Sequence, residues 1–201
     1  MEQKYKVIAI YGKGGSGKDT ILKKVLESKK FNLNKIVGIT TRPPREGEKD
    51  GVEYYFTSLD DFATKIISEE LVEAATFRGW YYGTSISAFS KDKINIGIFN
   101  DKALDVLLQD NRFEIVPVYI EVAAKNRLIR MLNREDDPDI DEIIRRYKAD
   151  EKDFEEFFVE HEELPIIIYL NNKSLDENAL IAYFDSLIAQ FDFWANPNKL
   201  N

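Results

Sequence analysis

The chain of 201 residues has no cysteine and a single histidine, His161. The absence of cysteine excludes a disulfide framework, a thiolate metal site and a cysteine nucleophile. One histidine also excludes metal sites built from several imidazoles. We expect His161, which lies between two glutamates, to be solvated rather than catalytic.

The sequence also lacks long apolar runs and an excess of basic residues. No stretch approaches the roughly 18–20 apolar residues that a membrane helix requires, and the first residues show neither a long apolar core nor a signal-peptide cleavage site. Lys and Arg number 28 against 36 Asp and Glu, a formal net charge of −8, which argues against a nucleic-acid polymer as the main partner. We therefore expect a cytoplasmic globular protein that does not bind membranes or nucleic acids.

Predicted strands and helices alternate along the chain, as in an α/β fold with a parallel sheet flanked by helices. Two consecutive strand signals without an intervening helix, turned at Arg78–Gly79, indicate a β-rich insertion. Strands are predicted at Lys6–Tyr11, Ile36–Thr40, Glu53–Ser58, Val72–Phe77, Trp80–Thr84, Ile94–Phe99, Ile115–Val122 and Leu164–Leu170, and helices at Thr20–Lys30, Leu59–Leu71 with Ser58 as N-cap, Asp101–Gln109, Ala123–Arg134, Asp139–Phe158 and Ser174–Trp194.

A glycine-rich segment between the first predicted strand and helix carries the strongest chemical signal. It fits the pattern G-x-x-x-x-G-K and consists of Gly12, Lys13, Gly14, Gly15, Ser16, Gly17, Lys18, Asp19 and Thr20. Such a loop turns successive backbone N–H groups toward an anion at a helix N-terminus, and its lysine neutralises the β- and γ-phosphates. The segment predicts ATP binding, with an ordinary glycine-rich turn as the alternative.

The residue after Lys18 departs from the usual pattern, in which Ser or Thr is a magnesium ligand. Here it is Asp19, followed by the hydroxyl of Thr20. A carboxylate can hold Mg²⁺ directly or through water, so Asp19 and Thr20 are both candidate ligands.

A second phosphate-binding candidate is the proline-stiffened segment Thr40–Phe56, which contains Arg42, Arg45 and Tyr54. Two guanidinium groups close together can hold a monophosphate in bidentate fashion, and a tyrosine hydroxyl can add a hydrogen bond. The alternative is a solvated charged loop.

This segment, Thr40-Thr41-Arg42-Pro43-Pro44-Arg45 onward, and the later stretch Glu73–Thr84 resemble guanylate kinases, which are P-loop nucleoside monophosphate kinases. The resemblance implies a parallel sheet core with a β-rich nucleotide-binding insertion and a helical lid. It divides the chain into core 1–35, insertion 36–92, core 93–122, lid 123–156 and core 157–201. It implies ATP-dependent phosphorylation of GMP or dGMP with Mg²⁺, by a monomer or homodimer.

By the same resemblance, Arg42, Arg45, Tyr54 and Tyr82 hold the acceptor phosphate, while Glu73 and Thr84 read the base. A carboxylate suits guanine because N1–H and N2–H₂ are adjacent donors, whereas adenine presents the N1 lone pair. The alternative for Glu73 is a solvated strand carboxylate. For Trp80 and Tyr81 we expect core packing.

The resemblance also assigns arginines of the predicted lid and one asparagine to the nucleotide. The candidate catalytic arginines are Arg130, Arg134, Arg145 and Arg146, with Glu135–Asp141 as the mobile part of the lid, and Asn171 of the pair Asn171-Asn172 is a candidate adenine-side residue. The alternatives are a solvated basic face paired with Asp136, Asp137, Asp139 and Asp141, and an ordinary strand-to-helix turn. Asp101 is a candidate for the magnesium side or for the N-cap of the helix that follows.

One departure affects the expected substrate. The family usually has a serine four residues before the first arginine, where this chain has Gly38. A deoxynucleoside monophosphate kinase with broader or shifted base choice is therefore one alternative. A non-catalytic, phosphopeptide-binding module is the other, although its donor loop tends to decay.

Overall fold

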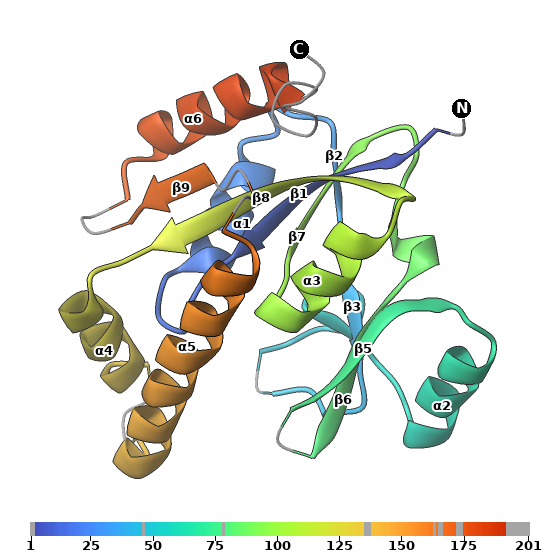
Figure 1. The fold of residues 1–201 in the computed structure, drawn as a ribbon, viewed down its shortest axis with the longest axis horizontal. Helices are drawn as coiled ribbons and strands as arrows, with labels where there is room; N and C mark the ends of the chain where they lie inside the picture. Colours follow the sequence, from blue (N-terminus) through green and yellow to red (C-terminus); the bar gives the residue numbers. More distant parts are fainter. Residues whose placement is uncertain are drawn as a thin grey trace. The chain divides into compact units, whose positions relative to one another are not determined.

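A computed structural model describes residues 3–45, 47–77, 79–134, 138–162, 164, 167–171 and 175–191. The strands are β1 Tyr5–Tyr11, β2 Leu33–Lys35, β3 Gly38–Thr40, β4 Tyr54–Phe56, β5 Leu71–Phe77, β6 Trp80–Ser85, β7 Ile94–Ile98, β8 Phe113–Glu121 and β9 Ile167–Leu170. The helices are α1 Lys18–Glu27, α2 Leu59–Ile67, the short 3-10 helix η1 Ile86–Ala88, α3 Asp101–Gln109, α4 Ala124–Leu132, α5 Ile140–Glu160 and α6 Glu177–Ala189 (Figure 1).

The chain forms two compact units. The first contains residues 1–8 and 32–115, and the second contains residues 9–31 and 116–201. The five-part division predicted from the sequence follows different boundaries and stays a prediction.

The predicted parallel sheet is present, with helices flanking its strands (Figure 1). Its five strands follow the order β2-β7-β1-β8-β9, and the pairs β2/β7 and β8/β9 are parallel. The run Val7–Tyr11 of β1 is completely buried, as expected for a strand covered on both faces. This strand leads directly into the glycine-rich segment.

A separate four-stranded sheet lies within the first unit, in the order β4-β3-β6-β5. β5 and β6 form the predicted antiparallel pair, with Gly79 at a positive φ of 79° in the turn. The strand predicted at Ile36–Thr40 appears as the shorter β3, Gly38–Thr40, which pairs with β4 and β6. The sequence missed β2, which precedes it and pairs with β7 in the other sheet. Hydrophobic periodicity reports burial and does not show that a chain changes partners.

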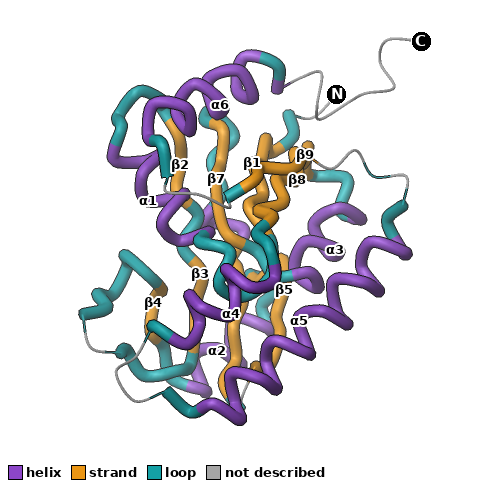
Figure 2. Tube along the Cα trace, turned by 90° about the vertical axis from the view of Figure 1, so that its left-hand side faces the viewer, coloured by secondary structure: helices purple, strands orange, loops and turns teal. Residues whose placement is uncertain are grey.

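Side-chain caps fix where several helices begin. Ser58 caps α2 as predicted, accepting a hydrogen bond from the N–H of Asp61 at 3.0 Å. α2 lies beside the four-stranded sheet (Figure 1 and Figure 2). Its buried Phe62 contacts the Tyr81 ring. None of the helices in the described ranges combines the length and apolar character that a membrane crossing demands.

Several predicted segments reach beyond the described residues; the strand predicted at Leu164–Leu170 appears as β9, with residues 165–166 outside the described ranges. The helix predicted at Ser174–Trp194 appears as α6, which begins after its cap Asp176, whereas residues 172–174 and 192–201 lie outside the described ranges. The mobile lid segment predicted at Glu135–Asp141 also lies partly outside them, at residues 135–137. From Pro138 onward that segment leads into α5.

Candidate functional site

The glycine-rich segment of the second unit forms a tight loop between β1 and α1. Gly15 and Gly17 adopt positive φ angles of 77° and 88°, which glycine adopts without steric cost. Space also demands glycine: a Cβ on Gly15 would lie 2.7 Å from the carbonyl oxygen of Arg127, and one on Gly17 would lie 2.7 Å from Nδ2 of Asn171. The loop is therefore wrapped closely by the elements that follow β8 and β9.

Lys18, the first residue of α1, folds back over this loop. Its Nζ donates to the carbonyl oxygens of Gly12 at 2.6 Å and Lys13 at 3.2 Å. Burial lowers the pKa of the ammonium, while the nearby carboxylates of Asp19 and Asp150 act in the opposite direction. A desolvated cation on a loop of backbone N–H groups suits an anionic ligand.

A buried arginine of α4 braces the loop. Arg127 is only 3% exposed; its Nε donates to the carbonyl of Gly14 at 2.9 Å and its Nη1 to Glu151 at 2.5 Å. Glu151 also pairs with Lys13 at 2.5 Å. Burial alone would raise the pKa of Glu151, but the hydrogen bonds from Lys13 and Arg127 leave it lowered.

Two predicted nucleotide-binding residues, Arg130 and Asn171, meet at the same loop. The Nη2 of Arg130 donates to the carbonyl of Asn171 at 2.9 Å, and Nδ2 of Asn171 donates to the carbonyl of Ser16 at 2.8 Å. Asn171 is thus a buried brace of the loop in this structure, and its adenine-side role stays a prediction.

The other three predicted catalytic arginines have different surroundings. The charge of Arg134 lowers the pKa of Lys18, which places this guanidinium within electrostatic range of the loop. Arg145 is exposed and pairs with Glu142 of its own helix through two hydrogen bonds, at 2.7 and 2.9 Å. Asp139, one of the partners in the alternative of a solvated basic face, caps α5 by accepting from the N–H of Glu142. Arg146 is half-buried on α5, and its catalytic role stays a prediction.

In the first unit, four of the predicted acceptor residues, Tyr54, Tyr82, Thr84 and Glu73, share one face of the four-stranded sheet. Side chains alternate along a strand, so the registers decide which residues are neighbours. Tyr54 pairs with Gly38, and Glu73 pairs with Thr84; the antiparallel register of β3 and β6 sets Gly38 beside Thr84. One row thus crosses all four strands in the order Tyr54, Gly38, Thr84, Glu73.

Arg42 follows β3 and is held by a carboxylate of its own loop. It is 7% exposed, and its Nη1 and Nη2 donate to the two oxygens of Glu48 at 2.9 and 3.0 Å. The guanidinium lies 5.7 Å from the ring centre of Tyr54. Glu48 and, more weakly, Tyr82 raise the pKa of Arg42, and this pairing lowers the pKa of Glu48.

Glu73 and Thr84 form the other end of the row. The Thr84 hydroxyl donates to Oε1 of Glu73 at 2.6 Å. Burial raises the pKa of Glu73, and the hydrogen bond from Thr84 opposes this. A half-buried carboxylate with one oxygen already oriented is a directed acceptor for adjacent N–H donors.

Three comparisons with known proteins bear on this geometry. The family model described as guanylate kinase matches residues 4–180. The chain belongs to the guanylate kinase family. A solved guanylate kinase from Anaplasma phagocytophilum has a similar fold, with a TM-score of 0.62 and 17% sequence identity, and the match covers 94% of this chain and 87% of that one.

Curated guanylate kinases are similar over part of their lengths. The protein from Schizosaccharomyces pombe is 37% identical over 121 residues, which cover 60% of both chains. The protein from Malacoplasma penetrans is 37% identical over 153 residues, 73% of this chain and 69% of the relative. The match to the Mesoplasma florum protein, at 43% identity, spans only 32% of that relative.

In this member of the guanylate kinase family, the remaining residues of the predicted acceptor segments differ in their contacts and exposure. The backbone N–H of Arg45 donates to Glu48 at 2.7 Å, and its side chain is exposed. Tyr54 and Tyr82 meet edge to face, with ring centres 5.7 Å apart. Trp80 and Tyr81 are 41% and 36% exposed, so the expectation of core packing was wrong. The Tyr81 ring still contacts Phe62 of α2, so it is covered on one side only.

The candidate magnesium ligands lie on two different helices. Asp19 and Thr20 are exposed on the first turn of α1. Asp101 belongs to the first unit as the first residue of α3, and the N-cap is Asn100, which accepts from the N–H of Ala103 at 2.7 Å. The N-cap reading of Asp101 was therefore wrong by one residue. In the part of the chain that the structure describes, no three His, Cys, Asp or Glu side chains gather as a metal cluster.

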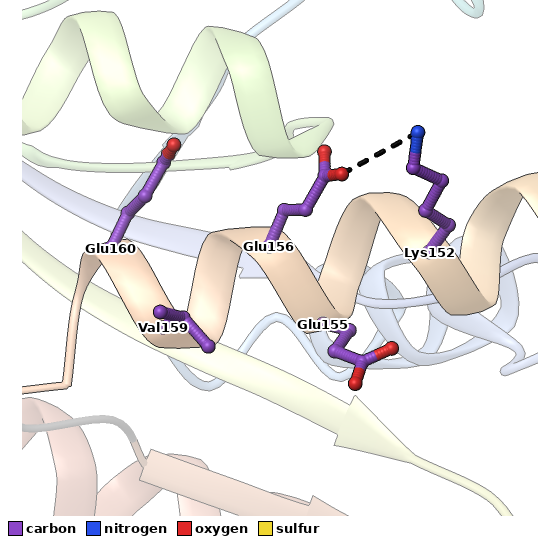
Figure 3. Close-up of a pocket in the computed structure, with 5 residues that line it drawn as sticks. All are labelled: Lys152, Glu155, Glu156, Val159 and Glu160. Atoms are coloured by element: carbon purple, nitrogen blue, oxygen red, sulfur yellow. Dashed lines mark ion pairs between the residues drawn. The ribbon is translucent and has the colours of Figure 1, made fainter.

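A shallow concavity of about 370 Å³ lies on α5. It is lined by Lys152, Glu155, Glu156, Val159 and Glu160, and Lys152 pairs with Glu156 at 3.5 Å (Figure 3). It shares no residue with either predicted site. Its acidic, exposed lining gives it no evident chemical role.

Sequence reasoning missed Arg127, Asp150, Glu151 and Glu48. Arg127 has a signal in hindsight, because it lies four residues before Met131 on the buried stripe of α4, where a charged residue requires partners. Asp150 and Glu151 lie in the middle of α5 among other charged residues, and no local pattern distinguishes them.

Proposed function

We propose that this protein transfers the γ-phosphoryl group of ATP to GMP or dGMP, forming ADP and the guanosine diphosphate. The observation that carries the proposal is the single sheet face that combines the Glu73–Thr84 pair with Arg42, Tyr54 and Tyr82. It joins an acceptor for guanine's N–H groups to a cation for a monophosphate. The intact glycine loop and Lys18 supply the donor site.

At the donor site, the loop N–H groups and the N-terminus of α1 would bind the β- and γ-phosphates. Lys18 would exchange its contacts with the carbonyls of Gly12 and Lys13 for phosphate oxygens. Arg130 and Arg134 would add charge against the transferring group, whose transition state spreads negative charge over its oxygens. In transfer, the bond from the β–γ bridging oxygen to the γ-phosphorus breaks and a bond from a GMP phosphate oxygen forms.

At the acceptor site, Arg42, Arg45, Tyr54 and Tyr82 would hold the monophosphate of GMP. Glu73 would accept from N1–H and N2–H₂ of guanine, with Thr84 fixing the orientation of its carboxylate. Adenine would set a lone pair against the same oxygens, at a cost of about 1–3 kcal/mol.

Magnesium fits the residues after Lys18. Asp19 and Thr20 offer exposed oxygen donors beside the lysine that would neutralise the same phosphates, and hard oxygen donors are those that Mg²⁺ prefers. When bound, the ion would neutralise charge on the β- and γ-phosphate oxygens. Asp101 stays a candidate from the first unit.

One observation favours a second substrate range. Gly38 lies in the middle of the row that would face the base and contributes no side chain to it. A broader or shifted base choice, including other deoxynucleoside monophosphates, follows if Glu73 alone does not discriminate. The phosphopeptide-binding alternative has less support, since the glycine loop keeps its geometry.

The test is ADP formation from Mg-ATP with each of GMP, dGMP, AMP, dTMP and dCMP. The proposal expects the highest kcat/KM with GMP or dGMP. Comparable rates with dTMP or dCMP would support the broader range, and no turnover with any of them would reject a kinase. Because its substrates are cytoplasmic nucleotides, we propose that it acts there, as a monomer or homodimer.

A further inference from the structure

A carboxylate of α5 lies on the glycine loop. The N–H of Gly14 donates to Oδ2 of Asp150 at 2.5 Å, a contact between residues 136 positions apart. A Cβ added to Gly14 would lie 2.8 Å from the same oxygen. The side chain therefore reaches the loop backbone itself.

The other neighbours of this carboxylate are cationic. Nη2 of Arg127 lies 3.5 Å from Oδ2 of Asp150, and this buried nitrogen has no hydrogen-bond partner among the described residues. The charge of Asp150 also acts on Lys18. In a loop of this kind, a phosphate oxygen accepts hydrogen bonds from a backbone N–H, a guanidinium and an ammonium group.

We propose that Asp150 occupies, in the nucleotide-free protein, the place that an oxygen of the donor's terminal phosphate takes when the nucleotide binds. Asp150 is then a positioning residue that keeps Gly14, Arg127 and Lys18 in place before ATP arrives. Nucleotide binding replaces this contact, whereas the pair between Glu151 and Lys13 still joins α5 to the loop. The inference rests on the donor half of the proposed function and does not depend on which acceptor is phosphorylated.

A purely structural reading makes a different prediction. If Asp150 only joins α5 to the loop, its contact persists with nucleotide bound and its removal lowers stability without improving phosphate binding. If it is exchanged for phosphate, its removal takes away a competing anion, and binding becomes tighter. The sign of the change in affinity therefore separates the two.

The experiment measures dissociation constants for ATP and inorganic tripolyphosphate by calorimetry, without an acceptor nucleotide. The proteins are the wild type, Asp150→Asn, Asp150→Ala and, as a matched control, Asp153→Asn. Asp153 is exposed on the same helix, and its variant makes the same charge change. We expect both Asp150 variants to bind both ligands about threefold to tenfold more tightly, with Asp153→Asn close to wild type. Unchanged or weaker binding in both Asp150 variants would overturn the proposal.

A second measurement uses only the wild type, in case both variants fold poorly. Amide hydrogen exchange of α5 around Asp150 is compared with and without tripolyphosphate. The proposal expects faster exchange there on binding, because the contact with Gly14 is released; unchanged or slower exchange contradicts it. Both measurements stand even if no monophosphate is phosphorylated, so their failure is distinguishable from failure of the proposed kinase activity.

Discussion

The two predicted phosphate sites differ in the groups that form them: one consists mainly of backbone and the other of side chains. The donor site in the second unit is mainly backbone, a loop whose glycines at positions 15 and 17 are fixed by conformation and space. The acceptor site in the first unit is made of side chains on a sheet face, with Arg42 as its buried cation. Both already hold a carboxylate: Asp150 accepts from Gly14, and Glu48 accepts from Arg42.

The carboxylates differ in what must move to release them. Glu48 belongs to the same loop as Arg42, six residues later, so it orients the arginine locally. Asp150 comes from a helix 136 residues along the chain, so releasing it involves α5. A site assembled from local contacts is set by its own loop, whereas one completed by a distant helix depends on how that helix is packed.

The largest expected effect comes from removing Lys18, the cation of the predicted donor site. Lys18→Ala should lower kcat by about 10²–10³-fold, since a preorganised charge aimed at the transferring group is lost. The dissociation constant for GMP should stay near that of wild type, because the acceptor face does not use Lys18. Steady-state kinetics with calorimetry of GMP checks both, and a wild-type kcat would remove Lys18 from the donor site.

On the acceptor side, the corresponding variant is Arg42→Ala, and Arg45→Ala serves as the comparison. Loss of Arg42 should raise the KM for GMP by about 10–100-fold, as expected for a charge-assisted pair, and should leave the dissociation constant for ATP unchanged. Arg45, whose side chain is exposed, should have a smaller effect on KM. Equal effects of the two variants would contradict the distinction between a buried and an exposed arginine.

Glu73→Gln tests base reading rather than phosphate binding. The ratio of kcat/KM for GMP to that for AMP should fall by about 10–100-fold, because the amide presents a donor where guanine also presents donors. Thr84→Val, which removes the hydroxyl that orients Glu73, should lower the same ratio less. An unchanged ratio in Glu73→Gln would move base recognition to another residue.

Two acceptor-side carboxylates should respond to pH with opposite signs. Burial raises the pKa of Glu73, so its contribution to stability is greatest at low pH and is lost as pH rises through the folded value. Arg42 lowers the pKa of Glu48, so the stability from that pair is present above the unfolded value, about 4.5, and is lost as pH falls.

Urea unfolding from about pH 4 to pH 8 should therefore show Glu73→Gln gaining on the wild type as pH rises. Glu48→Gln should be less stable than the wild type at neutral pH and approach it in acid. Parallel curves for all three proteins would contradict both assignments.

The smallest expected change concerns Gly38. A Cβ there would lie 3.3 Å from the carbonyl of Gly83 and 3.6 Å from the Tyr54 ring, so a serine fits with a small adjustment. Gly38→Ser adds a hydroxyl to the row beside Thr84 and should raise the preference for GMP over dTMP by about twofold to tenfold. Gly38→Ala adds the same Cβ without the hydroxyl and should not raise it.

The residue pattern alone indicated the glycine loop, whereas the acceptor face was assigned through the family resemblance, and the difference has a physical reason. Gly15, Gly17 and Lys18 are adjacent in sequence, and their residue types follow from backbone geometry. The row Tyr54, Gly38, Thr84, Glu73 depends on three strand registers, which the sequence did not predict; the roles of Tyr54, Thr84 and Glu73 came only through the family resemblance. The break between β2 and β3 and the bracing by Arg127 and Asp150 involve partners far away in sequence, which local patterns do not report.

The most direct test is a single-turnover experiment with ATP labelled in its γ-phosphate, excess protein and GMP. The account predicts that the label appears in the β-phosphate of GDP, one equivalent for each ATP consumed. Label recovered as inorganic phosphate, or ATP left intact while both nucleotides are bound, would contradict transfer between the two sites.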